Sequence, residues 1–359
     1  MTAICLTKYG IKNQIVSAGN TEGQILRNSN KISELKAAGI EFNYSVSRWK
    51  NNYGLGSFIS LIKTITSMPK PDLVVLHQIY SFSTILGYWY AKRYGIPYAV
   101  KPHGSLTKYH ESDSKCIKTL AKKIIISKVL LEADAIIVTC ESEKADLAIA
   151  LQSKAYNLPY GSFMSDQIDE VDAFSQPDNR NLRIVFSGRF DKKKNLPLLI
   201  MSLPQVLDKY PELILDIAGS GSSKEVNDVH LLVSSLQLEP HIQFHGWIEA
   251  RRMRRLLRAS KLLVLPSENE NFAIVVAEAL SLGIPCVVSK FVGAADIVAK
   301  HLAGEVIDQL TPTSIADGII KVLQGDEAAY RKAAIEATRD ELDWSKIALQ
   351  WKALIASLA

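Results

Sequence analysis

Residues 262–289 read LLVLPSENENFAIVVAEALSLGIPCVVS, and this stretch indicates the fold class. A short apolar run, Leu262–Leu265, stops at Pro266 and has the length of a buried strand. The segment after Phe272 predicts a buried helix, and Ile284–Val288 predicts the next strand. A strand, a helix and a further strand in this order are typical of a parallel, doubly wound α/β sheet.

Two carboxylates lie around the start of this predicted helix. Glu270 precedes it, and Glu278 follows eight residues later inside it. Eight helical residues span at most roughly 12 Å, so the two acids could hold two hydroxyl-bearing groups of one extended ligand. Backbone N–H groups of Asn271, Phe272 and Ala273 would face an anion between them, and a nucleotide sugar has this layout. Alternatively, Glu270 is a solvated loop acid and Glu278 makes only local contacts, although a buried acid needs a partner.

A basic loop follows an earlier predicted strand. Residues 184–186 predict that strand, and residues 187–195 read SGRFDKKKN before a helix expected over about 196–209. The forked guanidinium of Arg189 and the compact ammonium of Lys194 suit a diphosphate leaving group, whose charge grows as a glycosidic bond breaks. Cations at a helix start are electrostatically unfavourable. The loop therefore predicts an anionic ligand, with Lys192 and Lys193 left in solvent.

These two motifs carry a resemblance to a known family. Residues 182–330 resemble the C-terminal half of the retaining, nucleotide-sugar-dependent glycosyltransferases of family four, which have the GT-B fold of two facing Rossmann-like domains around a central cleft. Glu270 and Glu278 match the family's E-x7-E motif, and Gly188 to Lys194 match its G-R-x4-K segment. The family usually has glycines on both sides of the phenylalanine after the first Glu, where this chain has Asn271 and Ala273.

The resemblance implies roles for the donor-site residues. Arg189 and Lys194, beside Gly188, would hold the donor diphosphate. Glu270 would touch the sugar hydroxyls, and Glu278 would bind the ribose hydroxyls. The backbone around Gly246 would lie near the nucleobase, and both UDP and GDP sugars stay open.

Two histidines stand at predicted strand ends in the first half of the chain. His103 follows the strand at 98–100 and precedes Gly104, while His77 follows the strand at 73–76. His103 resembles the histidine of the family's histidine-glycine loop, which lies close to the transferred sugar. A histidine before a glycine is otherwise often structural, and His77 is a minor candidate.

Charge is unevenly distributed along the chain. Residues 1–130 contain 18 Lys and Arg against 6 Asp and Glu, whereas residues 181–359 contain 21 of each kind. The basic positions Lys118, Lys122 and Lys123 alternate with Ile and Leu, as in a helix that lies on an anionic membrane surface. The alternative is an ordinary surface helix with its apolar stripe in the core. No nucleic-acid-binding motif accompanies the charge, so nucleic acid is not an expected partner.

Length and composition complete the expected organisation. The chain has 359 residues, 47% hydrophobic and 22% charged, enough for two domains. Four cysteines without metal-ligand spacing, and no signal peptide or membrane-length apolar run, favour a cytoplasmic protein, either in solution or peripheral on the inner face of the cytoplasmic membrane. The resemblance implies an acceptor-binding domain over 1–165, a linker over 166–181, a nucleotide-sugar-binding domain over 182–340, and a C-terminal helix over 341–359 that crosses back toward the first domain.

The resulting hypothesis is a retaining hexosyltransferase that uses no metal and no cofactor. It would move a hexose from a nucleoside-diphosphate sugar to a saccharide or lipid-linked saccharide acceptor of an envelope polysaccharide such as exopolysaccharide, O-antigen or lipopolysaccharide. Catalysis would rest on positioning and charge stabilisation by Arg189, Lys194, His103 and Glu270. The alternatives are another GT-B enzyme, such as a sugar-nucleotide epimerase or a phosphorylase-like enzyme, and a non-catalytic GT-B scaffold.

Overall fold

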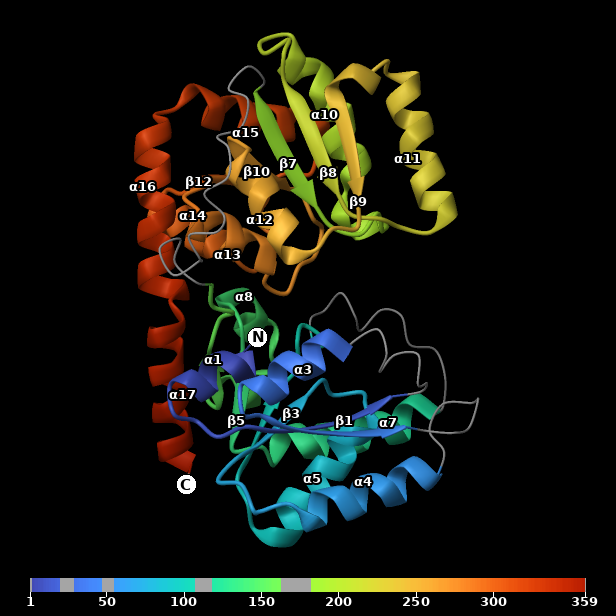
Figure 1. The fold of residues 1–359 in the computed structure, drawn as a ribbon, viewed down its shortest axis with the longest axis vertical. Helices are drawn as coiled ribbons and strands as arrows, with labels where there is room; N and C mark the ends of the chain where they lie inside the picture. The colour runs from blue at the N-terminus through green and yellow to red at the C-terminus, as the bar shows by residue number, and fades with distance from the viewer. Residues whose placement is uncertain (1, 20–28, 47–54, 107–117, 163–181, 359) are drawn as a thin grey trace. The chain divides into compact units, whose positions relative to one another are not determined.

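The computed structural model describes residues 2–19, 29–46, 55–106, 118–162 and 182–358, and it divides into two compact units (Figure 1). The first unit comprises Met1–Leu158 and Trp344–Ala359, and the second comprises Pro159–Asp343. Each unit is an α/β structure in which every paired strand is parallel. The predicted α/β fold class is therefore confirmed. The predicted linker, 166–181, lies outside the described residues.

The first unit contains a two-stranded and a four-stranded sheet, ordered β1-β2 and β3-β4-β5-β6. The strands are β1 (Gln14–Gly19), β2 (Glu41–Val46), β3 (Val74–His77), β4 (Tyr98–Lys101), β5 (Ala135–Val138) and β6 (Ala155–Asn157). The helices are α1 (Thr2–Lys8), α3 (Ser29–Ala37), α4 (Leu55–Ser67), α5 (Phe82–Tyr94), α7 (Lys118–Leu131), α8 (Glu141–Asp146), α9 (Ile149–Gln152) and α17 (Trp344–Leu358). Strands β4 and β5 are buried throughout, as expected for apolar strands covered on both faces.

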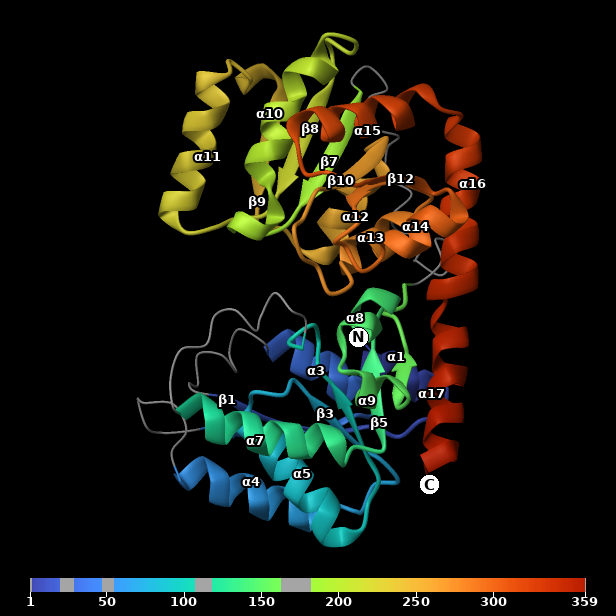
Figure 2. The ribbon, with the colours of Figure 1, turned by 180° about the vertical axis from the view of Figure 1, so that it is seen from behind.

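The second unit contains one six-stranded sheet in the order β12-β11-β10-β7-β8-β9. Its strands are β7 (Arg183–Ser187), β8 (Ile214–Ala218), β9 (Ile242–Gly246), β10 (Leu262–Leu265), β11 (Cys286–Ser289) and β12 (Gly304–Ile307). Its helices are α10 (Leu196–Leu207), α11 (Ser223–Ser235), α12 (Ala250–Arg258), α13 (Ile274–Ser281), α14 (Ala295–His301), α15 (Pro312–Gln324) and α16 (Glu327–Ala337). Helices α10, α11 and α15 cover one face of the sheet, and α12 and α13 cover the other (Figures 1 and 2).

The strand order of the second unit reverses between β7 and β10. From β7 the chain adds β8 and β9 on one side, and it then crosses to add β10, β11 and β12 on the other. In open parallel sheets the loops at the carboxyl ends of the two strands beside such a reversal diverge, and ligands bind there. The loops that carry the two predicted motifs leave β7 and β10, so the topology brings both motifs to this point.

One boundary differs from the prediction. Residues 159–162 were expected in the first domain, but they pack with the second unit. The ring of Tyr160 meets the ring of Phe272 edge to face at 5.7 Å, and the N–H of Ser162 donates to the carbonyl of Leu342 at 2.8 Å. The aromatic contact and the backbone hydrogen bond attach these residues to the second unit.

Candidate active site

The loop after β7 and the loop after β10 are bonded to each other. The buried side chain of Asn195 donates from Nδ2 to the carbonyl of Pro266 at 3.0 Å, and the N–H of Glu268 donates to the carbonyl of Lys193 at 2.7 Å. Asn195 has φ +53°, a left-handed conformation that Asn adopts more readily than most residues. It follows a single 3-10 turn over Lys192–Lys194, so the position of Lys194 is fixed on both sides.

Lys194 and Glu270 form an ion pair between these two loops. Lys194 Nζ contacts Glu270 Oε1, and the side chains are only 14% and 15% exposed. The backbone of Glu270 is held by the 289–293 segment: its N–H donates to Phe291 O at 3.1 Å, and its carbonyl accepts from Gly293 N at 3.0 Å. The structure therefore brings together the lysine and the first glutamate of the two motifs.

Gly188 lies directly against the alkyl chain of Lys194. A Cβ atom at this glycine would lie 3.3 Å from both Cδ and Cε of the lysine. The neighbouring Gly219 has φ +150°, and a Cβ there would lie 1.8 Å from the carbonyl oxygen of Gly188, so no side chain fits. Glycine at position 219 thus lets the loops after β7 and β8 approach closely.

The segment between the two glutamates turns sharply before α13. Ala273 is the residue before the helix and has φ +68° and ψ +79°, in the left-handed region that favours glycine. The side chain of Phe272 is buried, so only its backbone is available to a donor. Asn271 and Ala273 replace the family's usual glycines, and the backbone keeps the left-handed turn at Ala273 in spite of its Cβ.

Glu278 lies on α13 among buried residues such as Ala277 and Ala279. Burial raises the pKa of its carboxyl, and the positive charge of Arg254 on α12 opposes this rise. Arg254 was not identified from the sequence, where it is one of five arginines in a single helix. A carboxylate held in a poorly solvated place is destabilised until a ligand hydroxyl bonds to it, and ribose supplies two.

Two of the predicted donor residues, Arg189 and Gly246, contact other groups in this structure. Arg189 pairs with Asp191 at 2.7 Å, and 73% of its side chain is exposed. The carbonyl of Gly246 accepts a hydrogen bond from Gly219 N at 2.8 Å, and Gly246 has φ +63°. Trp247 follows with 78% of its surface exposed.

The first unit places both predicted histidines side by side. His77 Nδ1 lies 2.9 Å from His103 Nε2, and the rings stack with centroids 5.1 Å apart. Desolvation of the charged form by the surrounding protein lowers the pKa of each imidazole to about 4, and the positive charge of Lys101 lowers both pKa values further. The pKa of His77 is lowered further by His103 itself. Both rings are therefore neutral near pH 7.

Comparison with known proteins identifies the family. Residues 167–341 match the family described as glycosyl transferases group 1, and residues 34–158 match the glycosyl transferase 4-like domain. The chain belongs to glycosyltransferase family four. It is thus a nucleotide-sugar glycosyltransferase of a retaining family, as the resemblance in the sequence implied.

The individual relatives share a low sequence identity with this chain. A D-inositol 3-phosphate glycosyltransferase of Corynebacterium glutamicum is 23% identical over 373 residues, which cover 98% of this chain and 89% of that protein. A phosphatidyl-myo-inositol mannosyltransferase of Mycobacterium tuberculosis is 26% identical over 214 residues, 56% of this chain and only 53% of the relative's own length. The structure of Anabaena HepE in complex with UDP and glucose has a TM-score of 0.74 at 17% identity, over 99% of this chain and 95% of that one. This likeness confirms the predicted GT-B fold.

The basic segment predicted to face a membrane is only partly described. Lys118, Lys122 and Lys123 belong to α7, but their side chains lie outside the described residues. In the rest of the helix, Ile126, Val129 and Leu130 are buried, which agrees with an apolar stripe in the core. Three further apolar residues of α7 are exposed: Ile124, Ile125 and Leu131.

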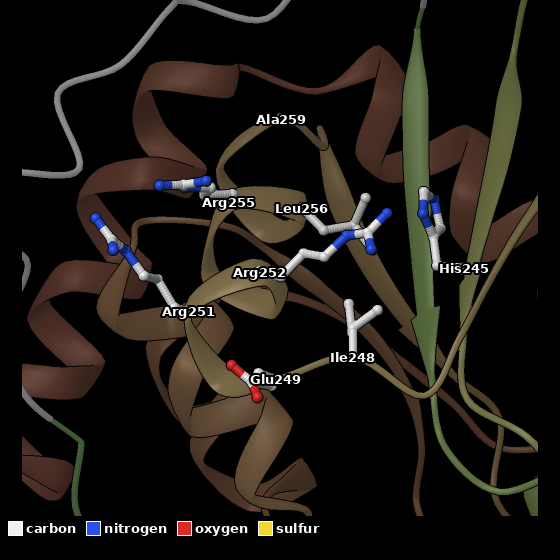
Figure 3. A pocket seen from close by; sticks show the side chains of 8 residues that line it. All are labelled: His245, Ile248, Glu249, Arg251, Arg252, Arg255, Leu256 and Ala259. Carbon is white, nitrogen blue, oxygen red and sulfur yellow. The ribbon is translucent and has the colours of Figure 1, made fainter.

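A cavity of about 460 Å³ lies beside α12 (Figure 3). Among the described residues, its lining includes His245, Arg251, Arg252 and Arg255 but neither member of the Lys194–Glu270 pair nor Glu278. Arg252 points toward His245, while Arg251 and Arg255 point to the opposite side of the helix. Because these guanidinium groups diverge, the cavity does not concentrate positive charge on one ligand position.

A metal site and a membrane span were also sought within the described ranges. There, no group of three or more His, Cys, Asp or Glu side chains is placed to hold a metal ion. In the same ranges, no helix is both long enough and apolar enough to cross a membrane.

Proposed function

We propose that this glycosyltransferase moves a hexose from a nucleoside-diphosphate sugar to a hydroxyl of a saccharide acceptor, with the donor on the second unit. The observation that carries the proposal is the Lys194–Glu270 pair at the reversal of strand order. A cation and a carboxylate, each about 85% buried on ordered loops, are what a diphosphate and a sugar ring need side by side.

Each donor group has a residue to receive it in this proposal. Lys194 has three N–H donors, so it can keep one bond to Glu270 and direct another to the β-phosphate. Glu270 then accepts from the sugar hydroxyls, and Glu278 accepts from the ribose. Arg189 reaches the diphosphate by exchanging Asp191 for phosphate, which costs little because an exposed ion pair contributes only about 0–1 kcal/mol.

The chemistry follows from this arrangement. The acceptor oxygen forms its bond to the anomeric carbon on the face from which the diphosphate leaves, and the acceptor proton passes to the departing phosphate oxygen. The bond between the anomeric carbon and that oxygen breaks, and the electron pair stays with the diphosphate. Lys194 and Arg189 stabilise the growing negative charge, while His103 positions the sugar. Within this mechanism no metal ion is required.

We further propose a lipid-linked or envelope-polysaccharide acceptor used at the inner face of the cytoplasmic membrane. One relative is named for phosphatidyl-myo-inositol, a lipid. Ile124 and Ile125 on α7 are 65% and 43% exposed, beside the basic positions of the same helix. Apolar residues next to lysines are the pattern that binds an anionic lipid surface.

Nucleotide binding tests the donor site. Thermal unfolding should be followed with UDP, GDP, ADP and TDP without added metal; UDP is the first candidate because HepE was solved with UDP and glucose. One nucleotide should raise the melting temperature, and Glu278→Ala should abolish the shift. The control, Glu212→Ala, removes an exposed acid before β8 and should leave the shift intact.

The outcome also separates the alternatives. Incubation of the matching nucleotide sugar with lipid-linked saccharides should give a glycosylated product. A folded protein that binds none of the nucleotides would favour a non-catalytic scaffold. Conversion of the donor to an epimer, without any sugar transferred, would favour an epimerase.

A further inference from the structure

Two adjacent strand ends in the first unit finish in an uncommon backbone conformation. Gln78, directly after β3, has φ +66°, and His103, after β4, has φ +54°. These ends are neighbours, because β3 and β4 pair with His77 opposite Lys101, and Gln78 N donates to Lys101 O at 3.0 Å. Left-handed backbone at a residue other than glycine costs roughly 1 kcal/mol and persists only where its surroundings fix it.

The two turns place one imidazole against the other. A hydrogen bond between His77 Nδ1 and His103 Nε2 at 2.9 Å contains one proton, so exactly one of these nitrogens is a donor. Whichever nitrogen holds it, the position of the proton on one ring determines the tautomer of the other. The two tautomers are therefore coupled before any substrate binds: the proton of His103 is on Nδ1 when His77 donates, and on Nε2 when His103 donates.

Glu143 holds the backbone beneath His103. Its carboxylate, on α8, is 2% exposed and accepts from Gly104 N at 2.7 Å and from both the N–H and the hydroxyl of Thr139, at 2.8 and 2.9 Å. A carboxylate acceptor makes such bonds about twice as strong as a neutral one. The bond to Gly104 N fixes the residue that directly follows the histidine.

A buried lysine completes the surroundings of this turn. Lys101 is the last residue of β4, and its Nζ lies 5.8 Å from the centroid of the Trp351 ring of α17. Burial lowers its pKa to about 8, and the charge of Glu143 opposes that change. The opposite charges of Lys101 and Glu143 offset part of each other's cost of burial.

We propose that His77 and Glu143 are positioning residues for His103: His77 fixes the tautomer and orientation of its ring, and Glu143 fixes its backbone. The proposal rests on the proposed function in one respect, since it assigns His103 to the transferred sugar. The positioning itself is a property of the enzyme without substrate. It can therefore be measured separately from transfer.

Nitrogen-15 NMR of the histidine side chains tests the positioning without substrate. In the wild type, the two His103 ring nitrogens should show one protonated and one unprotonated signal. His77→Leu should convert them to the averaged signals of a mixture of tautomers, while His77→Asn, which keeps a polar group near the Nδ1 position, should largely restore the wild-type pattern. Unchanged His103 signals in His77→Leu would overturn the inference.

Kinetics test whether the positioning matters to the reaction. We expect His77→Leu and Glu143→Leu each to lower kcat by roughly 10- to 100-fold, the range for misplacing a reacting group by about 1 Å, with the nucleotide affinity unchanged. Glu143→Gln should recover part of the loss. Tyr98→Phe is the matched control, because it removes a buried 2.8 Å bond to Val129 O at the opposite end of β4. It should lower stability without lowering kcat.

A double variant tests whether His77 acts through His103, and the results that would overturn the inference differ from those that would contradict the proposed function. In a His103→Asn background, His77→Leu should cause little further loss of kcat, because the two residues act as one unit. Equal losses in both backgrounds would overturn the inference for His77. A kcat for Glu143→Leu equal to that of Tyr98→Phe would overturn it for Glu143. Absence of any sugar transfer by the wild type would instead contradict the proposed function and leave the NMR result standing.

Discussion

Replacing Lys194 by methionine removes the charge at the centre of the proposed donor site while keeping the length of the side chain. In the wild type, the ammonium contacts Glu270 and its alkyl chain lies under Gly188, so methionine keeps the packing and loses only the ion pair. A charge that stabilises a leaving group contributes a factor of about 100 to 1,000 in kcat, or about 2.7–4 kcal/mol. We expect a loss of kcat of this size.

The same change affects stability because Glu270 loses its partner. Its side chain is 15% exposed, so it retains some contact with water. Leaving a mostly buried acceptor without its partner costs about 1–3 kcal/mol, which corresponds to a fall of several degrees in melting temperature for a domain of this size. The double variant Lys194→Met/Glu270→Gln should recover much of that stability and none of the activity.

Steady-state rates of sugar transfer from the nucleotide sugar provide the assay. Lys192→Met is the matched control, because Lys192 belongs to the same turn and is exposed. This control should keep the wild-type kcat within a factor of about three, as expected for a surface charge. A Lys194→Met variant that is folded and turns over at the rate of Lys192→Met would refute the assignment of Lys194 to the diphosphate.

Three other predictions concern the same unit. Glu278→Gln should stabilise the ligand-free protein by about 1 kcal/mol, since it removes a poorly solvated charge, while it abolishes the nucleotide-dependent shift in melting temperature. The folded protein raises the pKa of Glu278 above its unfolded value, so the wild type should lose stability relative to Glu278→Gln as pH rises through the raised pKa. The difference in free energy of unfolding between the variant and the wild type should therefore widen with rising pH, and a difference that narrows in chemical unfolding would contradict this. Ala273→Gly should raise the free energy of unfolding by about 1 kcal/mol because it relieves the left-handed backbone; a lower value in urea would show that the turn is not strained. Gly188→Ala should weaken nucleotide binding by roughly 10-fold in titration calorimetry, because the new methyl displaces Lys194, and unchanged affinity would show that the lysine adapts.

The strands of the second unit were predictable because their sequences carry the signal themselves. Leu262–Leu265 is apolar throughout and ends at a proline, and it forms β10 with the predicted bounds. The ion pair between Lys194 and Glu270 was not predicted, although both residues were assigned to the donor site. Their contact depends on the bond from Asn195 to Pro266, which joins residues 71 positions apart. Such pairing is decided by topology and not by either motif.

In the first unit, the burial of Glu143 and the contact between His77 and His103 could not be predicted from the sequence. Glu143 lies in the run Glu-Ser-Glu-Lys, which looks like a solvated helix start, yet it is buried because Gly104 and Thr139 direct three N–H or O–H groups at it. His77 was only a minor candidate from the sequence, and the structure shows that its ring contacts His103, 26 positions away. Knowledge that β3 pairs with β4 in this register would have placed the two histidines together.

The measurement that tests the account most directly is a crystal structure of the protein with the nucleoside diphosphate that stabilises it best. The account predicts that a β-phosphate oxygen lies within hydrogen-bonding distance of Lys194 Nζ, about 2.7–2.9 Å, and that the ribose hydroxyls meet Glu278. A nucleotide found instead in the cavity beside His245 and Arg252, with Lys194 still paired only to Glu270, would contradict it.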